Sequence, residues 1–294
     1  MTDEAMSTQK ANVTPGVLYV VATPIGHLAD LSPRALAVLR EVDLIAAEDT
    51  RHTRALLTHF GVRTPLVSLH EHNEGRQVPG LVERLRSGAA IAVVSDAGTP
   101  LISDPGYGLV HAAAAAGLPL SPVPGPCAAI AALSVSGLPT DRFVFEGFLP
   151  ARSAARRAQL QGLAREPRTL VFYESPRRLI DALDDCAQVL GAARIACVGR
   201  EITKRFETFY RGTLAEVRAG IEQQAEAPRG ECVLMVAGAT APTYQPDGGL
   251  EAERILIDLA AQLPASQLAR LMDRWFGGGR AQWYARAVAL RAME

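Results

Sequence analysis

The sequence predicts two α/β domains followed by a small helical tail. Short apolar segments alternate with helical segments at first, the pattern becomes mixed near residue 140, and a proline- and glycine-rich linker at 240–249 precedes the tail. The chain has 294 residues, enough for about two domains at roughly 100–200 residues each. Apolar residues make up 48% of it, which is typical of a folded globular protein.

The first domain is expected over residues 16–139, after a disordered polar tail at 1–15. A helix begins at Pro33, because proline is favoured at the first helical position, and the next helix ends at Gly61. A further helix is expected to be broken near Pro79. Strands that alternate with helices predict a mostly parallel, doubly wound sheet. The expected strands are 16–22, 44–47, 65–69, 90–94 and 120–123.

The second domain is expected over residues 140–240 and has a mixed sheet. This domain opens near Arg142 with the segment R-F-V-F-E-G-F-L-P, and the segment 206–210 is expected to pair back as an antiparallel strand. Leucines and one cysteine at helical spacing predict a helix over 179–190. The remaining expected elements are strands at 169–173, 194–198 and 232–237 and a helix at 214–224.

The tail, residues 250–294, is expected to hold two helices around Gly277–Gly279. Two short helices around a glycine turn resemble a helix-turn-helix. A helical hairpin that packs on the main body would give the same pattern. The sequence leaves these two alternatives open.

Composition and motifs argue against several classes of protein. The four cysteines form no C-x-x-C pair, which argues against a disulfide framework or zinc site and indicates a reducing compartment. No segment approaches the ~20 apolar residues of a membrane helix, and no signal peptide is recognisable, so a cytoplasmic protein is expected. Neither a G-x-G-x-x-G nor a P-loop motif occurs. His70 and His72 lack a third ligand nearby, so no metal site is predicted.

The segment Ser95–Gly106, S-D-A-G-T-P-L-I-S-D-P-G, follows an apolar strand and is the strongest candidate for a ligand-binding loop. Small residues and prolines allow the backbone to approach a ligand closely, and ligands of open α/β sheets bind at the carboxyl ends of the strands. Asp96 and Asp104 can accept hydrogen bonds from a ligand. Either aspartate alone would be explained as a capping or turn residue.

Two segments are basic although the net charge is only −1. Residues 151–168 contain five arginines against one acid, and residues 264–294 contain five against two. This is compatible with a polyanion that docks on part of the surface. Taken alone, solvated helix faces explain it more simply.

Six ordered blocks of this chain resemble a known family. They are T-P-I-G-H-L-A-D-L from Thr23, E-D-T-R from Glu48, the 95–106 loop, V-P-G-P-C-A from Val123, F-Y-E-S-P-R-R from Phe172 and R-E-I-T-K from Arg200. Together they are similar to the signature of the small-subunit ribosomal RNA methyltransferase I family, a branch of the tetrapyrrole-methylase superfamily. The first loop departs from the G-x-G-P-G turn of the wider superfamily, which lowers the expectation of a tetrapyrrole substrate.

The resemblance implies S-adenosylmethionine as methyl donor, held in a cleft between the two domains. It also implies transfer to the ribose 2′-hydroxyl of a decoding-centre cytidine in 16S rRNA, and a homodimer. The cofactor-binding residues that it implies are Pro24, Asp96, Ala97, Gly98, Thr99, Ile102, Ser103, Pro126, Cys127, Ala128, Tyr173, Glu174, Ala237 and Gly238.

A ribose hydroxyl is a poor nucleophile, so a group that removes its proton is expected. Lys204 is one of only two lysines in an arginine-rich chain, and a desolvated lysine can act as a base. A chance surface charge is the alternative. Glu201 and Glu207 could orient this lysine or act as the base themselves, and Asp49 is a further candidate.

Arginines are expected to contact the RNA, because the guanidinium fork matches phosphate oxygens. Two other functions remain open: methylation of a tetrapyrrole or a diphthamide precursor on the same scaffold, and non-catalytic RNA binding in ribosome assembly. A small substrate would need neither the basic segment nor the tail. The expected substrate-binding residues are Arg51, Arg156, Arg157, Arg177, Arg178, Arg200, Arg274 and Arg280.

Overall fold

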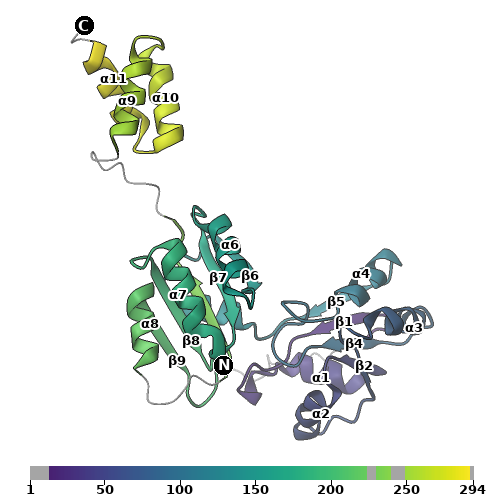
Figure 1. Cartoon of the computed structure of the whole chain (residues 1–294). Coiled ribbons are helices and arrows are strands. Elements are labelled where there is room, and N and C mark those ends of the chain that lie inside the picture. Colours follow the sequence, from purple (N-terminus) through teal and green to yellow (C-terminus); the bar gives the residue numbers. More distant parts are fainter. Residues whose placement is uncertain (1–12, 224–229, 240–248, 292–294) are drawn as a thin grey trace, which may run out of the picture. The chain divides into compact units, whose positions relative to one another are not determined.

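The computed structural model describes residues 13–223, 230–239 and 249–291, and these form two compact units. The two α/β domains make one unit, and the C-terminal helices with residues 165–168 and 238–239 make the other (Figure 1). Most of the predicted N-terminal tail, and all of the predicted linker except Gly249, lie outside the described residues. Among the helices that are described, none is both long and apolar enough to cross a membrane.

The first domain is a parallel sheet, as predicted, and its five strands lie in the order β3-β2-β4-β1-β5. Apolar side chains are buried on both of its faces, which explains why the strands are continuous apolar runs in the sequence. The strands are β1 (Leu18–Val21), β2 (Leu44–Ala47), β3 (Leu66–Ser68), β4 (Ile91–Val94) and β5 (Leu120–Val123). The helices are α1 (Pro33–Glu41), α2 (Thr50–His59), α3 (Glu74–Arg86), α4 (Tyr107–Ala115) and α5 (Ala128–Val135), with a 3-10 turn η1 (Leu28–Asp30).

Local chemistry sets the helix ends in this domain. The Ser32 hydroxyl accepts a hydrogen bond from Ala35 N–H at the start of α1, ahead of the predicted Pro33. The Asp49 carboxylate caps α2 in the same way. The predicted break near Pro79 is wrong, because α3 continues through this proline. Burial of Leu81, Val82 and Leu85 in the core is the contact that holds this part of α3 in place.

The second domain is a mixed sheet in the order β6-β7-β10-β8-β9. β6 and β7 are parallel, whereas β10 runs antiparallel to both β7 and β8, and β9 pairs antiparallel with β8. The strands are β6 (Phe143–Phe148), β7 (Thr169–Glu174), β8 (Ile195–Arg200), β9 (Thr208–Thr213) and β10 (Cys232–Val236). The helices are α6 (Ser153–Leu163), α7 (Leu179–Leu190) and α8 (Leu214–Glu222), with a 3-10 turn η2 (Pro176–Arg178).

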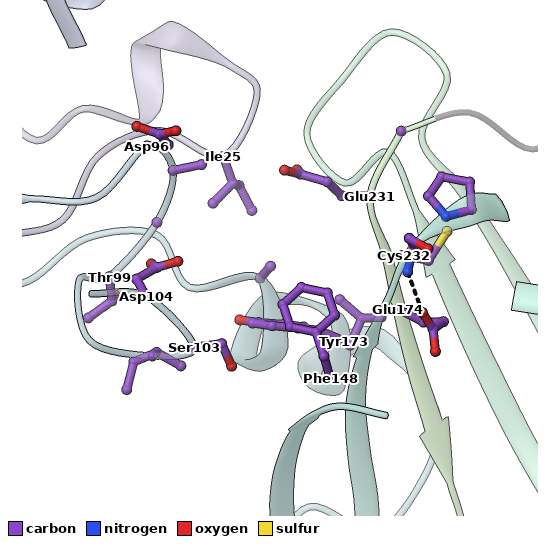
Figure 2. A pocket seen from close by; sticks show the side chains of 18 of the residues that line it. Ile25, Asp96, Thr99, Ser103, Asp104, Phe148, Tyr173, Glu174, Glu231 and Cys232 are labelled. Carbon is purple, nitrogen blue, oxygen red and sulfur yellow. Dashed lines mark hydrogen bonds between the residues drawn. The ribbon is translucent and has the colours of Figure 1, made fainter. Parts of the chain in front are cut away.

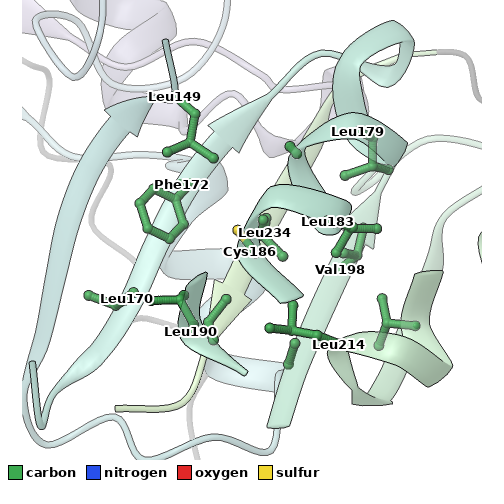
Figure 3. Close-up of a cluster of buried hydrophobic side chains, with 14 of the residues drawn as sticks. Leu149, Leu170, Phe172, Leu179, Leu183, Cys186, Leu190, Val198, Leu214 and Leu234 are labelled. Atoms are coloured by element: carbon green, nitrogen blue, oxygen red, sulfur yellow. The ribbon is translucent and has the colours of Figure 1, made fainter. Parts of the chain in front are cut away.

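One face of this sheet is covered by α7 and its neighbours. Figure 3 shows Leu183 and Cys186 of α7 beside Leu234 of β10, within a cluster that also contains Phe172 of β7. The buried positions of α7 repeat at the helical spacing that the sequence predicted.

Helix α5 covers the opposite face of the second sheet and so joins the two domains. Its residues Ala129, Ala132 and Leu133 pack in one cluster with Val171 of β7 and Met235 of β10. The loops at the strand ends of the first domain are therefore held against the second domain by apolar burial.

Helices α9 (Gly249–Ala260), α10 (Ala265–Phe276) and α11 (Arg280–Arg291) form the C-terminal unit. They surround a core of their own that includes Leu256, Leu268, Met272 and Trp283. The two predicted helices are present, and α9 is a third that the sequence analysis did not identify. Both alternatives considered for the tail lacked this helix.

A buried ion pair in the second domain generates a stability prediction. Asp185 accepts hydrogen bonds from Ser153 Oγ at 2.9 Å and from Arg156 Nε at 2.6 Å, with 8% of its side chain and 3% of that of Arg156 exposed. Removing one member of a buried pair leaves an uncompensated charge. We expect Asp185→Asn to lower the free energy of unfolding, measured by denaturant titration, by about 3 kcal/mol.

The neighbouring Asp184 supplies the matched control. Its carboxylate pairs with Arg218 at 2.7 Å on the surface, with 52% of the side chain exposed. Asp184→Asn should therefore cost less than about 1 kcal/mol. Equal losses in the two variants would contradict a structural role for the Arg156–Asp185 pair.

Candidate functional site

The candidate site lies where the strands of the first domain end. The segment after β1 and the loop after β4 are tied by paired hydrogen bonds, Thr23 N–H to Gly98 O at 2.8 Å and Gly98 N–H to Thr23 O at 3.0 Å. Gly98 has a φ of 82°, a left-handed conformation that favours glycine. The loop after β2 joins them, since Asp49 N–H donates to Asp96 Oδ1 at 3.0 Å.

A cavity of about 390 Å³ opens between these loops and the second domain. Figure 2 shows Asp96, Thr99 and Asp104 on one side and Tyr173, Glu231 and Cys232 on the other. The side chains of Ile25 and Phe148 add apolar wall. A cavity of this size with few polar groups is typical of small-molecule sites.

Most of the predicted cofactor-binding residues lie in the wall of this cavity. They are Asp96, Ala97, Gly98, Thr99, Ile102, Ser103, Ala128, Tyr173 and Glu174. Pro126 and Cys127 stand behind the wall: Thr99 Oγ1 donates to Pro126 O at 2.9 Å, and Cys127 Sγ is 4.0 Å from the Tyr173 hydroxyl. Pro24 lines a second, neighbouring cavity.

The structure does not bring Ala237 and Gly238 to the site. Because β10 runs antiparallel to β7, its first residue, Cys232, pairs with Glu174 at the cavity, whereas Ala237 follows the other end and donates to Ile195 O. Gly238 packs against Pro167. The segment 230–233, at the start of β10, lines the cavity instead.

Four residues that the sequence analysis did not assign to the site also line the cavity. Glu48 and Asp104 lie in motifs that the sequence analysis singled out, Phe148 lies in the R-F-V-F-E-G-F segment, and Glu231 precedes an apolar strand. The sequence does offer one indication for Glu231, since a charged residue directly before a buried strand lies at the end of that strand, where ligands often bind.

Acidic side chains dominate the electrostatics of the cavity. Burial, opposed by a Ser95 hydrogen bond and supported by the charges of Glu48 and Asp96, raises the pKa of Asp104 to about 6. Burial, followed by the charge of Asp96, also raises the pKa of Glu48. The cavity therefore favours a cationic ligand.

Of the predicted catalytic residues, Lys204, Glu201 and Glu207 share one loop after β8. Lys204 Nζ donates to Glu201 Oε1 at 3.0 Å and to Glu231 Oε2 at 3.3 Å. Partial burial works to lower the pKa of Lys204, but these carboxylates outweigh it and the pKa is raised. Glu207 accepts a hydrogen bond from Thr203 N–H at 2.7 Å.

Asp49 lies apart from this loop. Its hydrogen bonds from Arg51, from the side chain first and then from the backbone, lower its pKa to about 2. A carboxylate with so low a pKa is a weak proton acceptor near neutral pH.

Non-glycine residues with left-handed backbone occur in just two loops of the described chain. They are Leu101 and Ser103 after β4 and Glu201 and Thr203 after β8. Both loops adjoin the candidate site, and such conformations gather at functional sites.

The predicted RNA-contacting arginines differ in what surrounds them. Arg156 is buried and forms an ion pair with Asp185, so it has a structural role here. Arg157 forms a second ion pair with the same carboxylate, at 3.2 Å. Arg178 donates to Glu174 Oε1 and Leu149 O. Arg200 ends β8 and is half-buried. The four with exposed side chains are Arg51, Arg177, Arg274 and Arg280.

Within the described residues, no group of three or more histidine, cysteine or acidic side chains is arranged to hold a metal ion. His70 and His72 have ring centroids 6.0 Å apart.

The chain thus has two α/β domains and an acid-lined cavity at the strand ends of the first one. Residues 17–218 match the family model described as tetrapyrrole (corrin/porphyrin) methylases. The chain belongs to this family.

Curated relatives are similar over nearly the whole chain. The chain is 53% identical over 259 residues to ribosomal RNA small subunit methyltransferase I of Pseudomonas aeruginosa, covering 88% of this chain and 92% of the relative. It is 51% identical over 263 residues to the protein of the same name from Escherichia coli O157:H7, covering 90% and 91%.

Solved structures show the same fold at low identity. A diphthine synthase superposes with a TM-score of 0.57 at 16% identity, over 76% of this chain and 90% of that structure. A cobalt precorrin-4 methyltransferase superposes with a TM-score of 0.56 at 15% identity, over 76% and 95%. The predicted fold class is confirmed.

The raised pKa of Asp104 predicts a pH-dependent stability. Below its folded pKa of about 6 the carboxyl is neutral, and above it an ionised group is held in a partly dry, acidic cavity. The ligand-free protein thus loses stability as the pH rises from the unfolded pKa through about 6. After discounting for solvent screening, we expect Asp104→Asn to raise the Tm at pH 8 by about 2–4 °C.

At pH 4 the advantage of the asparagine should disappear, since the wild-type carboxyl is then protonated in the folded protein. Thermal melts at the two pH values check this. Asp30→Asn is the control, as Asp30 is an exposed residue of η1 outside the cavity lining. An Asp104→Asn effect of equal size at both pH values would mean that Asp104 does not titrate in this range.

Proposed function

We propose that this protein uses S-adenosylmethionine to methylate a ribose 2′-hydroxyl of 16S rRNA, at the decoding-centre cytidine 1402. The observation that carries the proposal is the acidic cavity between two methylase-type domains, in a chain about half identical to proteins named as ribosomal RNA small subunit methyltransferases. The ribose target and the nucleotide rest on the family resemblance of the sequence motifs.

The residues of the cavity fit this donor. When bound, S-adenosylmethionine supplies a methyl group on a positively charged sulfur and also carries an ammonium group. The carboxylates of Asp96, Asp104 and Glu231 can attract these charges, and Ile25 and Phe148 provide apolar surface. The paired hydrogen bonds between Thr23 and Gly98 hold the two loops that carry part of this lining together.

Proton removal from the acceptor hydroxyl belongs, in this proposal, to a carboxylate of the cavity wall. Lys204 would need a lowered pKa to act as a base, and its pKa is raised instead. We therefore assign Lys204 a positioning role through Glu201 and Glu231. Asp104, with a pKa of about 6, can accept a proton near neutral pH.

The C-terminal unit is proposed to contact the RNA or the ribosomal particle. Trp275 and Tyr284 are exposed on α10 and α11, beside the exposed Arg274 and Arg280. Aromatic rings can stack on unpaired bases, and arginines neutralise phosphates. A cytoplasmic location and a homodimer complete the proposal and rest on the sequence.

Two other functions are less well supported. The solved structures named as a diphthine synthase and a precorrin methyltransferase share the fold alone at 15–16% identity. A non-catalytic assembly factor would not need an acidic cavity with polar groups of raised pKa.

Mapping ribose methylation in 16S rRNA tests the function. Cells that lack this protein should lose one 2′-O-methyl group, and wild-type protein should restore it. We expect Ala128→Phe to restore nothing, because the ring fills the cavity and should weaken cofactor binding, measured by calorimetry, by at least roughly 100-fold.

Ser134→Phe is the matched control, as this residue is exposed on the same helix outside the cavity lining. It should bind the cofactor and methylate normally. An unchanged methylation map on removal of the protein would reject the RNA substrate, whereas full cofactor affinity in Ala128→Phe would reject the cavity as the cofactor site.

The independent core of the C-terminal unit allows a deletion test. A protein ending before residue 249 should keep its cofactor affinity and the Tm of the α/β unit. Its affinity for small ribosomal subunits should fall, and the dependence of that affinity on salt should flatten, because phosphate contacts are lost. Unchanged RNA affinity together with a lowered Tm would show that these helices stabilise the fold instead.

A further inference from the structure

A second cavity of about 450 Å³ adjoins the one assigned to the cofactor. Ile25, Asp96, Ala97 and Glu231 line both cavities and form their shared wall. A group bound in the second cavity would therefore meet a methyl group held in the first one at these residues. The volume lies in the range of small-molecule sites.

One face of helix α2 forms a side of the second cavity. His52, Ala55, Leu56 and His59 are spaced three and four residues apart, so they lie along one stripe of the helix. Leu28 adds apolar surface to the same cavity. Imidazole rings and apolar side chains are the surfaces on which an unstacked nucleobase packs in RNA-binding proteins.

Another part of the cavity lining is polar, and there the loop that contains Gly26 packs closely against Lys204. A Cβ placed on Gly26 would lie 2.5 Å from Lys204 Cγ, so only glycine lets the first loop pass so near the lysine. His27 N–H donates to Thr203 Oγ1 at 3.1 Å and ties the two loops together. Because Lys204 is paired with Glu201 and Glu231, this end offers hydrogen-bond acceptors rather than a free cation.

We infer that the second cavity receives the target nucleotide of the RNA, flipped out of its strand. This inference rests on the proposed function. The base packs against His52, Leu56 and His59, and the ribose points to the shared wall, where the carboxylates of Asp96 and Glu231 can accept from its hydroxyls. In the transfer, the ribose oxygen forms a bond to the methyl carbon while the carbon–sulfur bond breaks, its electron pair stays on sulfur, and the hydroxyl proton passes to Asp104 of the adjoining first cavity, the proton acceptor of the proposed function.

Filling the second cavity alone tests this assignment. We expect Ala55→Trp to lower methyl transfer to small ribosomal subunits by roughly 100-fold or more, since the reacting atoms can no longer be aligned. Its cofactor affinity by calorimetry should stay within about twofold of wild type, because Ala55 does not line the first cavity. Thr58→Trp on the same helix, exposed and outside both cavities, is the control and should change neither value.

Near-normal transfer by Ala55→Trp would overturn the inference. A parallel loss of cofactor affinity would do so too, because the cavity would then belong to the cofactor. If Ala55→Trp shows no cooperative melt, His52→Ala replaces it, with an expected rise in the KM for RNA of roughly 5- to 100-fold from lost stacking. An unchanged KM in His52→Ala overturns the inference.

A binding measurement separates this inference from the proposed function. Cytidine 5′-monophosphate, titrated in the presence of S-adenosylhomocysteine, should shift the NMR signals of the His52 and His59 imidazoles in wild type and not in Ala55→Trp. If wild-type protein fails to methylate ribosomal RNA but these shifts occur, the proposed function fails and the nucleotide site stands. Absence of the shifts in wild type overturns the site.

Discussion

The packing of helix α5 on the second sheet is the contact on which the rest of the structure depends. Ala129, Ala132 and Leu133 reach across to Val171 and Met235, and the small alanines allow the helix to lie close to the strands. The cavity opens beside this contact, because Ala128 at the start of α5 lines it together with Tyr173 of β7. Apolar burial at one place thus fixes the distance between two sets of polar loops.

The same contact explains why the loops can concentrate negative charge. Carboxylates lose hydration in this partly dry space and also repel one another, and both effects, burial first, raise the pKa values of Glu48 and Asp104. Packing elsewhere must stabilise the fold against this cost. A cationic ligand would relieve this cost, so the crowding of negative charge favours the binding of such a ligand.

Features that depend on local sequence pattern, such as strand positions, could be predicted from the sequence. Features that depend on strand direction or on burial in the folded protein could not. Apolar runs bounded by glycine and proline located the strands, and the 95–106 loop was placed correctly at a strand end. The family resemblance implied Ala237 as a cofactor-binding residue, but the antiparallel direction of β10 places Glu231 and Cys232 at the cavity instead. The composition of residues 151–168 could not distinguish a buried arginine, Arg156, from exposed ones. Helix α9 was not identified from the sequence, although Leu256 of this helix is buried in the core of the C-terminal unit.

The left-handed residues Leu101, Ser103, Glu201 and Thr203 have a consequence for heat resistance. Each of these residues costs of order 1–3 kcal/mol in local conformation. On warming, these loops open before the sheets do, since local openings have lower free energies than global unfolding. The protein should therefore become inactive at temperatures where its cores are still intact, and the upper limit of its working range is set by two short loops.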